Sequence, residues 1–441
     1  MDRVCVIGAG SSGLAACQVL HVRGIDFDCF EAGSEVGGNW RYLNDNGMSS
    51  AYRSLHINTS RQLMEFASYP MPADFPVYPD HFRIARYYDD FVKHHGLGAK
   101  ITFRTEVRHV EPLLDGGFRV TTRNRDTGDE QIEDYRAVIV ANGHHWDPRP
   151  PEPAFPGSET FTGEQIHSHH YKTPDAFVDK RVLVLGIGNS ACDIAVETAR
   201  VSERTFLAMR RGAHIVPKYL FGMPTDHLTT SWLAAKTPFW FQRLSFGLML
   251  RLARGKVTDY GLPAPDHRVL SAHPTVSDDL LGALGHGDIT VKPTIERFEG
   301  DQVHFVDGTA ERIDAVVHCT GYRISFPFLD ERVISVRDNK IALYRRVVDP
   351  EHDGLYFLGL IQPLGAIMPL AELQAEWVAD LVDGSAVLPS DREVRHEIQG
   401  YRKALAKRYV TSKRHTIEVD FFRYRGELSA ERRAGRTRAR R

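Results

Sequence analysis

The sequence predicts an α/β protein built from two doubly wound, Rossmann-like domains, on two observations. First, one layout occurs twice along the 441 residues: an apolar run, a glycine-rich turn, a helical stretch and, much later, a second apolar run. Second, a chain of this length exceeds one ordinary hydrophobic core. Parallel strands need crossover connections, which are usually helical. Such runs therefore predict parallel sheets covered on both faces.

The first copy of the layout begins near the N-terminus. Residues 4–7 predict a strand, residues 14–22 a helix and residues 137–143 the later strand. Between the first strand and the helix, the glycines of Gly8-Ala-Gly-Ser-Ser-Gly13 allow close approach to a pyrophosphate. A carboxylate at the end of the next strand accepts hydrogen bonds from an adenosine ribose. The residues predicted to contact this dinucleotide are Gly8, Ala9, Gly10, Ser11, Ser12, Gly13 and Glu31.

The second copy carries a different signal after its second strand. It has strands at 181–185 and 315–321, and the turn Gly186-Ile-Gly-Asn-Ser-Ala191 follows the first of them. No acidic residue that could bind a ribose follows the second strand, and two arginines stand there. A guanidinium pairs with a 2′-phosphate, so NADPH is predicted instead of NADH. A solvated charge pair that closes a strand is the alternative. The residues predicted here are Gly186, Gly188, Asn189, Ser190, Ala191, Cys192, Asp193, Arg210 and Arg211.

The proline-rich sequence and the positions of the glycine turns predict the domain boundaries. The proline-rich residues 148–153 cannot continue a helix or an inner strand, so they mark a crossing. After residue 322 a strand at 354–359 and a helix at 370–381 have no third glycine loop to serve. The first domain is therefore expected to be discontinuous, with residues 1–150 and 323–441 enclosing a second domain of residues 151–322. The basic residues 427–441 are expected to be a disordered tail.

Composition excludes several classes of protein. Lys and Arg number 55 against 57 Asp and Glu, which argues against a nucleic-acid surface over the whole protein. The five cysteines form no CxxC pair, which argues against a disulfide reductase of the same double fold and fits a reducing cytoplasm. Charges interrupt the apolar residues 232–252, so no integral membrane segment is expected. His167, His169 and His170 lack further ligands at metal spacing, so no metal site is expected.

The segment between the two copies matches the fingerprint of a known protein family. Phe161, Gly163, His167 and Tyr171 match the fingerprint FxGxxxHxxxY, and the chain resembles the flavin-containing monooxygenases from its first strand to about Trp377. The resemblance implies FAD in the first domain and NADPH in the second. It implies that reduced FAD takes up O2 as a C4a-hydroperoxide, which oxygenates a soft nitrogen or sulfur of a small amine or sulfide.

The resemblance also implies roles for residues outside the glycine turns. Asn58 falls where the family places a catalytic asparagine beside the reactive edge of the flavin, although asparagine is also an ordinary turn residue. A helix after residue 362 would lie under the flavin ring, and a buried core helix is the alternative. The further residues that the resemblance places at the flavin are Gly38, Asn39, Trp40, Thr59 and Gln362.

Other functions stay open at this stage. Tyr171 favours heteroatom oxygenation, because Baeyer-Villiger relatives usually carry Trp at that fingerprint position; Baeyer-Villiger chemistry and oxidative decarboxylation of indole pyruvate are the enzymatic alternatives. A nucleotide-sensing or nucleic-acid-binding protein that uses the arginines of residues 432–441 is the non-enzymatic one. Membrane-bound animal members end in a hydrophobic segment that this chain replaces with Arg-rich sequence. Family members often form dimers, so a homodimer is one expectation.

Overall fold

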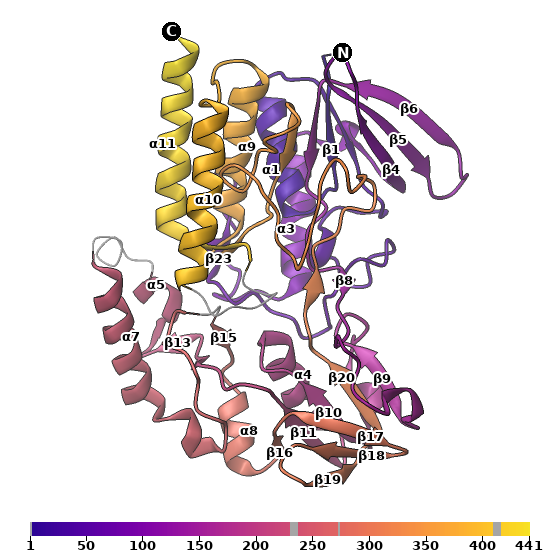
Figure 1. The fold of residues 1–441 in the computed structure, drawn as a ribbon, viewed down its shortest axis with the longest axis vertical. Helices are drawn as coiled ribbons and strands as arrows, with labels where there is room; N and C mark the ends of the chain where they lie inside the picture. The colour runs from indigo at the N-terminus through magenta and orange to yellow at the C-terminus, as the bar shows by residue number, and fades with distance from the viewer. Residues whose placement is uncertain (1, 230–236, 272–273, 409–415) are drawn as a thin grey trace. The chain divides into compact units, whose positions relative to one another are not determined.

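The computed structural model describes residues 2–229, 237–271, 274–408 and 416–441. It divides into two compact units (Figure 1). Unit 1 contains Met1–Ala51, Leu55–Asp147 and Arg323–Arg441, so both ends of the chain belong to it. Unit 2 contains Pro148–Tyr322 together with the short segment Tyr52–Ser54. The predicted fold class, two Rossmann-type α/β domains, is confirmed by the two sheets described below.

Unit 1 is built on a five-stranded parallel sheet with the strand order β22-β7-β1-β2-β3. Val4 of β1 pairs with Phe27 of β2 and Ala137 of β7, which sets the register. The strands are β1 (Val4–Ile7), β2 (Phe27–Phe30), β3 (Ile101–Thr102), β7 (Ala137–Val140) and β22 (Leu355–Phe357). The helices of the unit are α1 (Ser11–Val22), α2 (Arg61–Met64), α3 (His81–His94), α9 (Met368–Val382), α10 (Asp391–Arg408) and α11 (Phe421–Ala439).

The two faces of this sheet are covered differently. Val4 and Val6 of β1 belong to a core that includes residues of α1, α3 and α9. Cys5 and Ile7 point to the opposite face and pack with residues of an antiparallel meander instead of helices. The meander is formed by β4 (Thr105–Pro112), β5 (Phe118–Asn124) and β6 (Glu130–Tyr135). The meander, with β5 as its central strand, therefore covers one face of the parallel sheet.

Unit 2 repeats this plan. Its parallel sheet has the order β16-β11-β10-β20-β9, with α4 (Asn189–Ala199) and α8 (Leu280–His286) beside it. The strands are β9 (Glu164–His167), β10 (Arg181–Leu185), β11 (Arg204–Ala208), β16 (Ile289–Lys292) and β20 (Ala315–His318). A second meander of β17 (Ile295–Glu299), β18 (Gln302–Phe305) and β19 (Ala310–Arg312) packs on one face. The fingerprint segment thus supplies the edge strand β9.

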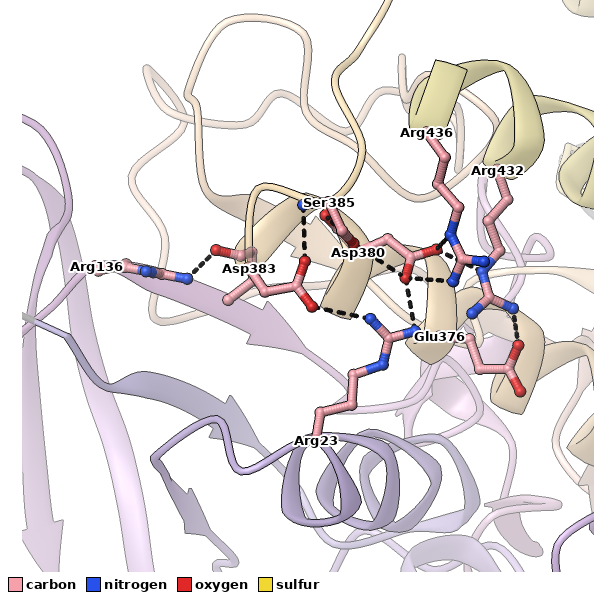
Figure 2. A network of polar contacts seen from close by, with 9 residues as sticks. Arg23, Arg136, Glu376, Asp380, Asp383, Ser385, Arg432 and Arg436 are labelled. Carbon is pink, nitrogen blue, oxygen red and sulfur yellow. Dashed lines mark hydrogen bonds and ion pairs between the residues drawn. The ribbon is translucent and has the colours of Figure 1, made fainter. Parts of the chain in front are cut away.

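The prediction of a disordered tail at residues 427–441 is wrong, because the segment lies almost wholly in helix α11. Asp380 of α9 is fully buried and explains the order. Its carboxylate accepts hydrogen bonds from Arg432 at 2.5 Å and Arg436 at 2.9 Å, and it pairs with Arg23 at the end of α1 at 2.6 Å (Figure 2). Arginines four residues apart share one helix face. The arginines that suggested disorder therefore form a charged interface between α11 and α9.

Unit 2 also contains the described part of the apolar stretch at residues 232–252. The described part of that stretch lies largely in α7 (Phe239–Arg254), which buries Phe246 and Leu250. Its exposed face presents Trp240, Leu244 and Leu248, each more than half exposed. Within the described ranges, no helix combines the length and the hydropathy that a membrane crossing requires. The remaining elements of this region are β12 (Ile215–Val216), β13 (Tyr219–Leu220), β14 (Met223–Pro224), α5 (Thr225–Thr229) and β15 (Thr275–Val276).

Candidate functional site

The first glycine turn leads directly from β1 into α1. A Cβ atom on Gly13 would lie 1.8 Å from the carbonyl oxygen of Gly8, so the close packing of helix against strand admits only glycine there. Gly10 is the N-cap of α1, and no side chain caps the helix. The backbone amides of the first helical turn, which begins with Ser11 and Ser12, therefore remain available to an anion. This is the donor set that a pyrophosphate requires.

Glu31 organises the same turn. Its side chain is buried, its Oε2 accepts a hydrogen bond from the Ala9 amide at 2.8 Å, and its Oε1 accepts from the Gly33 amide at 2.8 Å. The Asn46 amide donates to Oε1 at 3.0 Å. A carboxylate oxygen can accept two hydrogen bonds, so Oε2 retains capacity for a ribose hydroxyl. Glu31 thus has a structural task in addition to the predicted one.

Two other predicted segments lie beside this turn. The Gly37 amide donates to the carbonyl of Ala9 at 3.0 Å, which places the short helix Gly38–Trp40 against the first turn. Asn39 uses its side-chain oxygen to accept from Ser50, so its amide nitrogen, not its oxygen, is the free end. Gly359 packs against Ser12, and Gln362 follows it in β23 (Gln362–Leu364). Residues 37–40 and Gly359, from distant parts of the chain, therefore lie against the same turn.

Asn58 lies in a bend just before α2. The preceding backbone is fixed, because the Ile57 amide donates to the carbonyl of Pro79 at 3.1 Å. Thr59, the next predicted residue, is buried. Asn58 itself is partly exposed, and no described residue hydrogen-bonds to its side-chain amide. A rigid backbone that carries an uncommitted amide is suited to hold a ligand atom.

The second glycine turn repeats the first. Gly188 is the N-cap of α4 and no side chain caps this helix, so its first amides, from Asn189 and Ser190 onward, are also available. The Asn189 side-chain oxygen accepts from Val276, which fixes the loop, and Ala191 is buried. Cys192 is fully buried in the helix core, so its side chain points inward. Its backbone amide donates to the carbonyl of Gly188 at 3.1 Å, so neither the side chain nor the amide of Cys192 is directed at a nucleotide.

The arginines expected at the 2′-phosphate follow strand β11. The Gly186 amide donates to the carbonyl of Ala208 at 2.9 Å, so this strand end lies next to the second glycine turn. Arg211 makes a loose ion pair with Asp266 at 3.5 Å. Arg210 is exposed and forms no ion pair with any residue that the structure describes. An unpaired guanidinium at this position is suited to a phosphate.

The four fingerprint residues are structural parts of unit 2. Phe161 packs on Phe298 with ring centroids 5.1 Å apart, and a Cβ on Gly163 would come within 2.5 Å of a backbone oxygen. His167 ends β9, and burial lowers its pKa to about 4, so it is neutral at neutral pH. Tyr171 is 1% exposed and stacks on Phe177. The side chains of His167 and Tyr171 are therefore buried in unit 2, and that of Phe161 is partly buried against its core.

The structure also reveals contacts that the sequence analysis missed. The Tyr171 hydroxyl donates to Glu197 of α4 at 2.6 Å. Asp193, which is also predicted at the nucleotide, accepts a hydrogen bond from the Tyr52 hydroxyl. The signal was present, because Asp193 and Glu197 stand four residues apart and share one face of a helix. On a helix such acids are usually solvated, so the spacing alone could not identify the contacts.

Two uncapped helices, each directly after a glycine turn at the end of a parallel strand, are typical of proteins that bind two dinucleotides. Comparison with known proteins gives the family. A family model described as flavin-binding monooxygenase-like matches residues 1–435. The chain belongs to the flavin-containing monooxygenases. It is accordingly an FAD-dependent monooxygenase that takes reducing equivalents from NADPH.

Relatives and solved structures agree with that placement. Flavin-containing monooxygenase 5 of Cavia porcellus is 38% identical over 443 residues, which cover 97% of this chain and 82% of the relative. Flavin-containing monooxygenase 3 of Homo sapiens is 35% identical, with the same coverage. The S-allyl-L-cysteine S-oxygenase of Allium sativum has a TM-score of 0.73 at 27% identity, and covers 97% of this chain and 88% of its own. An open form of cyclohexanone monooxygenase has a TM-score of 0.71 at 16% identity, covering 99% of each chain, and shares the fold.

Proposed function

We propose that this enzyme oxygenates soft nitrogen or sulfur atoms of small molecules, with unit 1 binding FAD and unit 2 binding NADPH. The reduced flavin, when bound, supplies the chemistry that activates O2 and passes one oxygen atom to the substrate. The protein's own residues bind and orient the nucleotides and keep stray protons away from the reacting atoms. Asn58 is the residue proposed to touch those atoms.

The nucleotide assignments rest on differences between the two copies. The first copy presents the carboxylate of Glu31, which suits the unphosphorylated ribose of FAD. The second copy presents Arg210, which suits the 2′-phosphate of NADPH. Both copies offer an uncapped helix N-terminus to a pyrophosphate. The negative charge of Glu31 therefore supports FAD in unit 1, and the positive charge of Arg210 supports NADPH in unit 2.

The role of Asn58 rests on its free amide. Its Nδ2 can donate a hydrogen bond to an oxygen atom at the reactive edge of the cofactor, while an amide does not titrate at neutral pH. A neutral donor holds an oxygen in place without delivering the proton that would release peroxide. No other single observation in the structure supports oxygenation as directly as this uncommitted amide on a fixed backbone.

The preference for nitrogen or sulfur rests on Tyr171 and on one relative. Tyrosine stands at the fingerprint position that Baeyer-Villiger relatives usually fill with tryptophan. The Allium sativum relative, at 27% identity, is an S-allyl-L-cysteine S-oxygenase. The likeness to cyclohexanone monooxygenase, at 16% identity, concerns the fold and does not favour ketones. Heteroatom oxygenation is therefore the first activity to seek.

The experiment is a substrate screen with the flavin-loaded protein. O2 uptake, NADPH oxidation and hydrogen peroxide would be recorded separately for tertiary amines, thioethers, cyclic ketones and indole-3-pyruvate. We expect NADPH oxidation coupled to an N-oxide or sulfoxide. Lactone or ester products would establish Baeyer-Villiger activity instead, and indole-3-acetate would establish oxidative decarboxylation. A purified protein that does not retain flavin would favour a nucleotide-sensing role.

We also infer a cytoplasmic location. All five cysteines are free thiols and four of them are buried, as expected for a protein that folds in a reducing compartment. Cell fractionation with marker enzymes for each compartment tests this inference. Recovery in an oxidising compartment would contradict it.

A further inference from the structure

We infer that Glu197 and Tyr171 are positioning residues for oxygen transfer, because they hold the chain segment that leads to Asn58. The inference rests on the proposed role of Asn58. It gives the fingerprint tyrosine a physical task in this protein, namely to fix a carboxylate on α4 that in turn holds Tyr52–Ser54. This segment is the short piece of the N-terminal chain that belongs to unit 2.

Two carboxylates on one face of α4 receive three hydroxyl groups. Asp193 accepts a hydrogen bond from the Tyr52 hydroxyl, and Glu197 accepts one from the Ser54 hydroxyl. The second oxygen of Glu197 accepts a hydrogen bond from the hydroxyl of Tyr171 at 2.6 Å. Both oxygens of Glu197 are therefore in use, one for the segment and one for the fingerprint. We call this set of five residues the α4 clamp.

The backbone adds a further tie between the segment and the fingerprint. The amide of Arg53 donates to the carbonyl of Lys172, the residue after the fingerprint tyrosine, at 2.9 Å. The rings of Tyr52 and Tyr171 meet edge to face with centroids 6.1 Å apart. The segment is thus held by side chains on α4 and by the main chain at the end of the fingerprint.

Beyond the clamp, the chain enters unit 1 and is fixed again. The His81 amide donates to the carbonyl of Leu55 at 3.0 Å, and the Ile57 amide donates to Pro79 at 3.1 Å. Asn58 is the next residue. It lies four residues after Ser54, so at most about 14 Å of extended chain separates them. With so short a connection, loosening of the clamp leaves the backbone that carries Asn58 held by the hydrogen bonds of Leu55 and Ile57 without the support of the preceding segment.

The protonation states favour this arrangement. Burial raises the pKa of Tyr52 and of Tyr171, so both hydroxyls keep their protons and act as donors. Burial also raises the pKa of Glu197, an effect that the hydrogen bond from Tyr171 opposes. Removal of the Tyr171 hydroxyl would therefore remove a donor that stabilises the charged form of Glu197. The bond to Ser54 would then weaken as well, although Ser54 itself is unchanged.

The test compares Tyr171→Phe with Tyr135→Phe. Tyr135 is also buried and also donates to an aspartate, Asp28 at 3.0 Å, but it lies in the meander of unit 1. Each variant loses one hydroxyl that is bonded to a carboxylate, so a general cost of the substitution appears in both. Ser54→Ala is the third variant, because it opens the clamp from the other side.

The first readout does not depend on activity. Hydrogen exchange of backbone amides in residues 52–60 should speed up by about tenfold in Tyr171→Phe and in Ser54→Ala, the scale of one hydrogen bond to a charged group. It should stay unchanged in Tyr135→Phe. Unchanged exchange in both clamp variants would overturn the inference.

The second readout is the fate of NADPH. In the clamp variants the share of NADPH that ends as hydrogen peroxide should rise several-fold, while the rate of flavin reduction changes less than twofold. Faster exchange with unchanged coupling would overturn the positioning role. If the wild-type protein oxygenates no substrate in the screen while the exchange result holds, the proposed function fails and the clamp stands as the device that fixes residues 52–60.

Discussion

The backbone nitrogen of Ala9 donates a hydrogen bond to Oε2 of Glu31 over 2.8 Å, which joins the first glycine turn to the end of the second strand. The hydrogen-bond partners of this carboxylate in Ala9, Gly33 and Asn46 are all donors. The turn therefore needs an acceptor with two oxygens. The same residue is proposed to bind the ribose of FAD, so turn geometry and cofactor affinity should change together.

We expect Glu31→Gln to weaken FAD binding. The glutamine amide would direct an N–H group at one of three donors, and one lost charged hydrogen bond costs about 1.5 to 3 kcal/mol, or roughly ten- to a hundredfold in affinity. Equilibrium dialysis of FAD against the apoprotein measures the change. Glu133→Gln, on the exposed strand β6, is the matched control and should keep wild-type affinity.

Arg210→Ala, Arg211→Ala as a double variant should lose the preference for NADPH over NADH. Each charged hydrogen bond to a 2′-phosphate contributes about 1.5 to 3 kcal/mol, and NADH has no such phosphate. The measurement is the ratio of kcat/KM for the two nucleotides in flavin reduction. The control is Arg204→Ala, which removes an arginine from the start of β11, the strand that precedes Arg210 and Arg211. This variant should leave the ratio unchanged. An unaltered ratio in the double variant would remove these arginines from the site.

Asp380→Ala should destabilise unit 1 severely. The substitution leaves Arg23, Arg432 and Arg436 without their shared buried partner, and removal of one member of a buried ion pair costs about 3 to 5 kcal/mol. Urea unfolding followed by far-UV circular dichroism gives the free energy of unfolding. Arg433→Ala, on the exposed side of α11, should change that free energy by less than about 0.5 kcal/mol. If Asp380→Ala lowered the free energy of unfolding no more than Arg433→Ala does, the interface would not contribute to stability.

Acid should destabilise unit 2 through its buried histidines. Burial lowers the pKa of His167 and of His318 to about 4, below the value of about 6.5 in an unfolded chain. The unfolded state therefore binds more protons between these values, and stability falls as the pH drops from about 6.5 toward 4. By pH 5 each histidine should contribute a loss of about 1 to 2 kcal/mol.

Urea unfolding of His167→Gln at pH 7 and pH 5 checks this account. The variant should lose less stability between the two pH values than the wild-type protein does. His286→Gln is the control, because His286 is exposed at the end of α8 and its substitution should not alter the pH dependence. Equal pH dependence in all three proteins would argue against a neutral, buried His167.

The parallel strands and the glycine turns were predictable because they depend on local patterns. The strand predicted at 181–185 is β10 as observed, and the helix predicted at 370–381 lies within α9. An apolar run must be buried on both faces, and a glycine turn before a helix has few alternatives. These features hold regardless of the rest of the chain.

The helical C-terminus and the α4 clamp were not predictable from local patterns. The arginines of α11 are ordered by Asp380, which lies more than fifty residues earlier, and Glu197 binds Ser54 from a segment 143 residues away. Such contacts require the tertiary structure, since a charged residue on a helix is solvated unless a distant partner reaches it. The hydrogen bond from Tyr52 to Asp193 is a further example, because the two residues are 141 positions apart in the sequence.

The most direct test of the central claim is the ratio of oxygenated product to NADPH consumed in Asn58→Ala and in the isosteric Asn58→Asp. Neither substitution touches the glycine turns or the arginines, so FAD content and the rate of flavin reduction should equal those of the wild-type protein. Both variants lack the neutral amide donor, so we expect the ratio to fall at least tenfold while hydrogen peroxide accounts for the remaining NADPH. Full coupling in both variants would contradict the account and reduce Asn58 to a turn residue.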